Sequence, residues 1–134
     1  FADRLRNVRV CCGDWQRICG KSPTFRQGLT GVFLDPPYSS DTDRDPELYR
    51  EENLSVAHEV RVWAIEQGDN PLLRIALCGY DGEHDMPSSW AKVKWKANGG
   101  YSNIGNGKGK ENSSREVIWF SQFCLQPEQR GLFG

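Results

Sequence analysis

The sequence lacks any long apolar run. Across its 134 residues, uninterrupted apolar stretches reach only about four to six residues, whereas a helix that spans a bilayer needs roughly 18 to 20. It also lacks the pattern of a signal or transit peptide. We therefore expect a cytoplasmic protein with no membrane partner, folded as a single domain over residues 1–134.

Paired cysteines are missing as well. The chain has five cysteines, an odd number, and three of them crowd one segment (Cys11, Cys12 and Cys19) without the paired spacing of a zinc site. Cys11, Cys78 and Cys124 lie in or beside apolar runs, where a thiol behaves as a small hydrophobic side chain. The pattern predicts reduced cysteines that pack in the interior, and it predicts no metal site.

Neither sign of charge is in excess. The 17 basic and 18 acidic residues give a net charge of -1, which does not indicate a polyanion as partner. The charges are unevenly distributed, because residues 1–34 carry a net +4, residues 35–85 a net −9 and residues 86–134 a net +4. Either basic end could contact phosphates, or its charges could simply be solvated, and both interpretations stay open.

Apolar segments and their connections predict an α/β fold. A strand, a helix and a second strand follow one another between residues 31 and 78, which is the order of a parallel crossover. The last two strands are joined by a Gly/Asn/Ser/Lys-rich loop at 97–114 and predict an antiparallel hairpin. The expected strands are Val8–Cys12, Gly31–Leu34, Leu72–Cys78, Lys92–Lys96 and Val117–Phe120, and the expected helix runs from Asn53 or Ser55 to Gln67.

The tetrapeptide Asp35-Pro36-Pro37-Tyr38 follows the buried strand at 31–34 directly. Two consecutive prolines cannot continue a ladder, so these residues must lie just past the carboxyl end of that strand, where open α/β sheets bind ligands. The Asp35 carboxylate and the Pro36 carbonyl are acceptors for an exocyclic amine, and Tyr38 offers a flat ring for stacking. An adenine base fits this set; a proline-stiffened loop without function is the other interpretation.

Asp-Pro-Pro-Tyr after an apolar strand resembles the catalytic motif of the S-adenosylmethionine-dependent DNA adenine N6-methyltransferases. The stretch from Val8 to Leu125 resembles the carboxyl-terminal half of phage and bacterial DNA adenine methylases. The resemblance implies a three-layer Rossmann-like half-domain, with a mostly parallel sheet and a C-terminal antiparallel hairpin. It implies that Asp35, Pro36, Pro37 and Tyr38 are catalytic, and that the partner is double-stranded DNA with a flipped adenine.

The same resemblance implies a cofactor contact at Gly13-Asp14-Trp15. In that family, the acidic residue accepts the adenine amine of S-adenosylmethionine and its aromatic neighbour packs on the ring, roles that would fall to Asp14 and Trp15. An Asp that caps the next turn, with Trp15 in the core, is the equally weighted alternative.

The family's glycine-rich turn, which binds the methionine part of the cofactor, is absent from this chain and would lie before Phe1. The segment Gly105–Gly109 lies between two strands and is typical of a hairpin tip instead. We therefore expect the chain to lack the amino-terminal cofactor-binding half, and its expected protein partner is either this separate half or a second copy in a homo-oligomer.

Basic residues around the predicted hairpin are candidates for phosphate contact, with Tyr101 as a stacking residue; lysines that block strand-edge aggregation are the alternative. His58 is predicted to lie on the surface or in the core, without a functional role. The loop at 81–87 is predicted either to line the adenine pocket or to bind nothing. Two other functions remain open: a non-catalytic nucleic-acid-binding module, which is a remnant or a split subunit, and a structural fragment whose partner half restores the sheet. The proposed DNA contacts are Lys94, Lys96, Tyr101, Lys108, Lys110 and Arg115.

Overall fold

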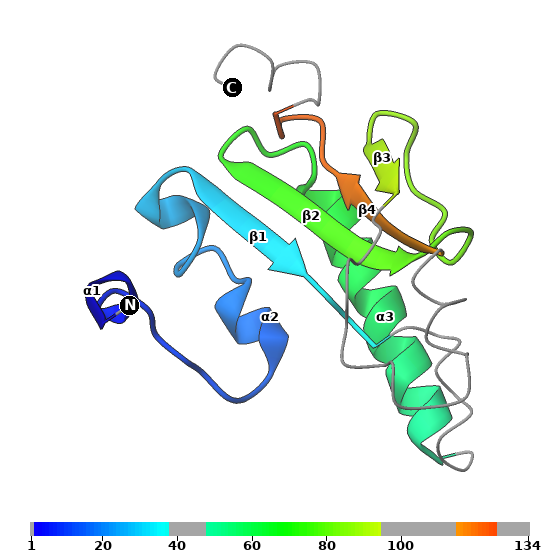
Figure 1. The fold of residues 1–134 in the computed structure, drawn as a ribbon, viewed down its shortest axis with the longest axis horizontal. Coiled ribbons are helices and arrows are strands. Elements are labelled where there is room, and N and C mark those ends of the chain that lie inside the picture. Colours follow the sequence, from blue (N-terminus) through cyan, green and yellow to red (C-terminus); the bar gives the residue numbers. More distant parts are fainter. Residues whose placement is uncertain (1, 38–47, 95–114, 126–134) are drawn as a thin grey trace.

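The computed structural model describes residues 2–37, 48–94 and 115–125 (Figure 1). Two short helices come first, and a long helix then connects the first two strands. The elements are α1 (Ala2–Leu5), α2 (Trp15–Ile18), a 3-10 turn (Phe25–Gln27), β1 (Thr30–Leu34), α3 (Leu48–Gln67), β2 (Leu73–Tyr80), β3 (Ala91–Lys94) and β4 (Glu116–Phe120).

The described strands form one sheet in the order β1-β2-β4-β3. β1 and β2 are parallel, with Leu34 opposite Leu77, while β4 is antiparallel to both β2 and β3. The predicted α/β class, parallel crossover and terminal hairpin are confirmed. The expectation of a mostly parallel sheet is wrong, because a long helical connection makes only the β1–β2 pair parallel and the other strands return antiparallel.

The core lies between the sheet and α3, which crosses one face of it (Figure 1). Three residues of β2 that point to this face, Leu73, Ile75 and Leu77, have no exposed surface at all. They pack with Val117 and Trp119 of β4 and with apolar residues of α3. β2 is buried on both faces from Ile75 onward, which explains why its sequence shows no alternation of apolar and polar residues.

The sheet face opposite α3 has no helix over it in the part of the chain that the structure describes. Phe33 of β1 is 65% exposed there, and it lines an apolar hollow of about 590 Å³ with Ala76 and Phe120. The described residues therefore form two layers, one sheet and one helix, rather than the three layers that we expected.

The predicted strand at Val8–Cys12 is wrong. This segment has no regular structure, Val10 is 94% exposed, and Cys11 is exposed rather than packed in the interior. Val8, Val10 and Cys12 would share one face of a strand, but none of the described strands pairs with this segment. The other two cysteines of the prediction agree better with the structure, since Cys78 is buried and Cys124 is half-buried.

Helix α3 begins at Leu48, five residues before the predicted Asn53 cap. The added residues include two glutamates, which have a high helix propensity. The predicted end at Gln67 is confirmed, and Gly68 follows it.

Gly68 permits the close packing of Trp90 against the end of α3. A Cβ at position 68 would lie 2.7 Å from Cζ2 of Trp90, whose side chain is buried.

We expect Gly68→Ala to lower the free energy of unfolding by about 1–3 kcal/mol through overpacking, as measured by urea denaturation. Gly31→Ala is the control, because nothing lies within 4 Å of a Cβ there. Equal stability of the two variants would contradict this account of Trp90.

Candidate active site at the carboxyl edge of the sheet

The ends of three strands meet at one edge of the sheet. β1 and β2 are parallel, and β3 runs in the direction of β2 because both are antiparallel to β4. The residues after β1, the residues after β2, the end of β3 and the start of β4 therefore share this edge (Figure 1), which we call the carboxyl edge. Open α/β sheets bind their ligands at such an edge.

Asp35, Pro36 and Pro37 stand at the carboxyl edge directly after β1, as predicted. Leu34 and Pro36 are buried, whereas Asp35 and Pro37 are exposed. Leu34 is paired with Leu77, so Asp35 comes beside Cys78 along the ladder. The third group of the predicted adenine site, Tyr38, lies outside the described residues.

The charge of Asp35 reaches the neighbouring thiol. The pKa of Cys78 is raised to about 11, first by burial and then by the negative charges of Asp35 and Glu116. Cys78 therefore stays protonated at neutral pH and is a poor nucleophile, because the thiolate is the reactive form. Of Asp35, Cys78 and Glu116, only the hydrogen-bond acceptor Asp35 is exposed.

Arg115 is held over the ring of Tyr80, the last residue of β2. Its guanidinium carbon lies 5.0 Å from the ring centroid, a cation–π distance. The backbone carbonyl of Arg115 accepts a hydrogen bond from the Asp81 amide at 2.8 Å, and the Tyr80 amide donates to Glu83 Oε2 at 2.8 Å. Arg115, a predicted DNA contact, therefore lies at the same edge as Asp35. No local sequence pattern predicts its contact with Tyr80.

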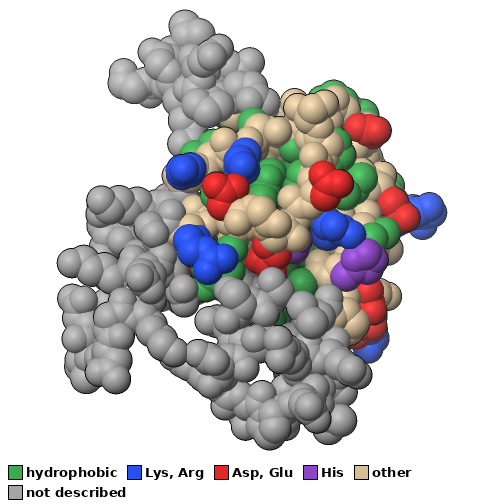
Figure 2. Space-filling model, turned by 90° about the vertical axis from the view of Figure 1, so that its right-hand side faces the viewer, with side chains coloured by type: hydrophobic (Ala, Val, Ile, Leu, Met, Phe, Trp, Pro, Cys, Tyr) green, Lys and Arg blue, Asp and Glu red, His purple; other side chains and the backbone are tan. Residues whose placement is uncertain are grey.

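Lys94 ends β3 at the carboxyl edge and is exposed. The pKa of Asp81 is lowered by the hydrogen bond and charge of Lys92, whose Nζ lies 2.8 Å from Asp81 Oδ1, and further by the charge of Lys94. Basic and acidic side chains are interspersed on the face in Figure 2. The other predicted DNA contacts, Lys96, Tyr101, Lys108 and Lys110, lie outside the described residues.

Asp14 and Trp15 take the arrangement of the capping alternative. Asp14 Oδ1 accepts a hydrogen bond from the Gln16 amide at 2.9 Å and caps α2. Trp15 is half-buried, packs against the core and meets Trp63 of α3 edge to face, with ring centroids 6.0 Å apart. Without a strand at 8–12, this aromatic contact and a hydrogen bond between Gln16 and Glu59 connect α2 to α3. The cofactor role of Asp14 and Trp15 stays a prediction.

His84, in the loop after β2, packs into the core. Its ring centroid lies 5.3 Å from that of Trp119, and the ring occupies the space that a Cβ at Gly79 would fill. Its Nε2 is buried without a hydrogen-bond partner in the described ranges. His58, by contrast, is exposed on α3 with Nδ1 2.9 Å from Arg61 Nη2.

The described residues contain neither a metal-binding cluster nor a membrane-spanning helix. Residues 2–37, 48–94 and 115–125 contain no cluster of three His, Cys, Asp or Glu side chains that would hold a metal ion. Over the same ranges, no helix has the length and apolarity needed to cross a membrane.

Comparison of the chain with protein-family models, curated proteins and solved structures finds no match.

The buried position of His84 predicts a loss of stability in mild acid. Burial lowers the pKa of His84, and Arg61 lowers it further, although Glu83 and a hydrogen bond with the Cys78 backbone oppose the shift. The folded protein therefore binds this proton less readily than the unfolded chain. The free energy of unfolding should be fully present above the unfolded pKa of about 6.5 and should fall as the pH drops below it.

Urea denaturation at pH 7.5, 6.5 and 5.5 measures this effect, with His84→Asn expected to flatten the pH dependence. His58→Asn is the matched control, because His58 is exposed and should leave the pH dependence unchanged. If His84→Asn and the unmodified chain lose the same stability between pH 7.5 and 5.5, the proposed titration of His84 is wrong.

Proposed function

We propose that this chain is the catalytic-motif half of a DNA adenine N6-methyltransferase with a Rossmann-like fold, acting in the cytoplasm. One observation carries the proposal: Asp35-Pro36-Pro37, Arg115 and Lys94 come from three different strands and stand at one edge of the sheet. An acceptor group and two cations at this edge fit a substrate that combines an amine-bearing base with phosphates. The β1–α3–β2 crossover with its terminal hairpin supports the fold.

In the proposed reaction, the flipped adenine presents its exocyclic amine to the Asp35 carboxylate and the Pro36 carbonyl. These two acceptors would hold both N–H groups and point the nitrogen lone pair toward the methyl donor. Pro36 restricts the backbone between the two acceptors because its ring fixes φ, and Pro37 restricts the conformation of Pro36. Tyr38 would stack on the base, as the resemblance implies. Arg115 and Lys94 would contact the phosphates that flank the flipped nucleotide.

The described residues fit one part of S-adenosylmethionine. Asp14 is an exposed carboxylate and Trp15 is only half-buried, so an acceptor and an aromatic surface are present for the cofactor's adenine. Bound there, the cofactor would supply an electrophilic methyl group on its sulfonium. No glycine-rich turn for its methionine part occurs in the sequence, so the proposal places that contact on another polypeptide segment.

Removing the Asp35 carboxylate tests the catalytic role. We expect Asp35→Asn to lower the transfer of tritiated methyl groups from S-adenosylmethionine to duplex DNA by about 100-fold or more, because the amide keeps one acceptor oxygen but loses the negative charge and the second oxygen. The thermal unfolding midpoint of the variant shows whether it is folded. Asp69→Asn, at the amino end of β2, is the control and should keep full activity. Full activity of Asp35→Asn would exclude this role.

A second candidate is a split subunit or a nucleic-acid-binding remnant that transfers no methyl group by itself. This candidate is favoured by an apolar part of the sheet that no described element covers. β1 ends the sheet, so its outer edge has no partner among the described strands, and Phe33 and Leu29 are about two-thirds exposed beside it. Apolar sheet faces normally pack against another layer. DNA binding without methyl transfer by the unmodified chain would support this candidate over the first.

The basic residues at the carboxyl edge predict salt-sensitive DNA binding. The double variant Lys94→Ala/Arg115→Ala should weaken duplex retention at low salt and reduce the slope of log affinity against log salt by about two, one for each lost phosphate contact. Fluorescence anisotropy with a labelled duplex measures both quantities.

The control is Lys21→Ala/Arg26→Ala, which removes the same charge from exposed positions before the start of β1, at the opposite edge. Equal losses of affinity in the two double variants would show that only net charge matters and would contradict a phosphate site at the carboxyl edge.

A further inference from the structure

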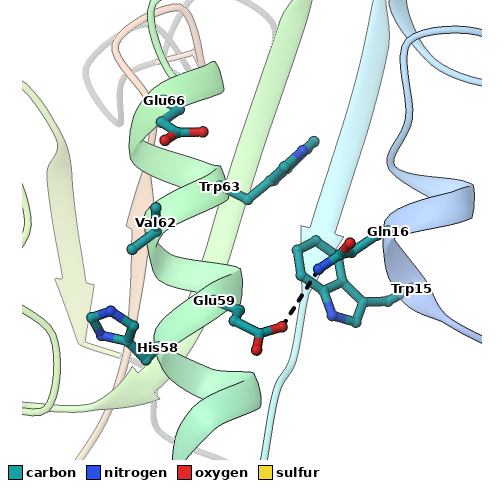
Figure 3. A pocket seen from close by; sticks show the side chains of 7 residues that line it. All are labelled: Trp15, Gln16, His58, Glu59, Val62, Trp63 and Glu66. Carbon is teal, nitrogen blue, oxygen red and sulfur yellow. Dashed lines mark hydrogen bonds between the residues drawn. The ribbon is translucent and has the colours of Figure 1, made fainter.

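A groove between α2 and α3 is lined by none of the carboxyl-edge residues, and it shares Trp15 with the proposed cofactor contact. It has a volume of about 430 Å³ and is lined by residues of these two helices alone. Figure 3 shows Trp15 reaching it from α2, with Trp63, Glu59 and Glu66 arranged along α3. Its composition differs from that of the carboxyl edge, because it combines aromatic rings with carboxylates.

Two indole rings form a corner in this groove. The planes of Trp15 and Trp63 are 85° apart with centroids separated by 6.0 Å, and both side chains are half-buried. In an edge-to-face pair, one ring turns its edge to its neighbour, so its own face stays available to a third group. The face of a tryptophan is the best aromatic surface for a cation.

The charge of the groove has one sign. Glu59 and Glu66 are exposed, and neither lysine nor arginine occurs among the lining residues. Glu59 Oε2 accepts a long hydrogen bond, 3.4 Å from Gln16 Nε2. The two carboxylates would repel a phosphate and attract a cation.

We propose that the groove between α2 and α3 is a binding site for a small organic cation, an onium group such as quaternary ammonium or sulfonium. The indole faces would receive its apolar substituents, and Glu59 and Glu66 would balance its charge. This proposal does not rest on methyl transfer at Asp35. A methylated lysine side chain and a sulfonium compound share this chemistry, and separate ligands distinguish them.

Titration with tetramethylammonium chloride tests the site. The indole N–H resonances of the ¹⁵N-labelled chain, assigned with Trp15→Phe and Trp63→Phe, should shift in a saturable manner as the cation is added. Sodium chloride at the same ionic strength should not shift them. The neutral isostere 3,3-dimethyl-1-butanol should bind at least about tenfold more weakly, because it has the shape but not the charge. Equal binding of the alcohol, or no shift with tetramethylammonium, would overturn the proposal.

Carboxylate variants provide the matched comparison. Glu59→Gln/Glu66→Gln keeps the size of both side chains and should weaken tetramethylammonium binding about tenfold, whereas Asp85→Asn, which changes an exposed acid outside the groove, should not change it. Retention of full affinity by the double variant would refute the role of the carboxylates. Parallel titrations with Nε-trimethyllysine and S-adenosylmethionine then identify the source of the onium group, by whichever displaces tetramethylammonium at lower concentration.

Discussion

The parallel pairing of β1 with β2 is the contact on which the rest of the molecule depends. It helps to bury β2 from Ile75 onward, and it brings Asp35 beside Cys78 at the end of the ladder. The same pairing requires a long connection, which α3 supplies, and leaves the hairpin to complete the sheet on the other side of β2. A shift of one residue in this register would turn Leu34 out of the core and Asp35 into it.

The carboxyl edge and the groove between α2 and α3 suit ligands of opposite charge. Arg115 and Lys94 make the first site favourable for phosphates, whereas Glu59 and Glu66 make the second favourable for cations. The net charge of the whole chain is near zero and does not reveal that the two sites carry opposite charges, whereas the folded structure does.

Periodicity and chain order predicted the elements that pack in the core. The apolar runs before Asp35 and Gly79, and the helix that ends before Gly68, have strong local patterns, so their type and order were correct. The strand at Val8–Cys12 failed because a short apolar run says nothing about whether a neighbouring strand exists to pair with it. At the site, the double proline predicted the position of Asp35. The pairs Tyr80–Arg115 and Trp15–Trp63 are tertiary contacts between residues 35 and 48 positions apart, and no local signal reveals them.

The space above Gly79 has a consequence for how related sequences can differ. The ring of His84 and the ring of Trp119 both come within about 3.0–3.1 Å of where a Cβ at this position would stand. A methyl group at 79 would therefore require one of these rings to shift by a few tenths of an ångström, so the size of residue 79 is coupled to the packing of both rings.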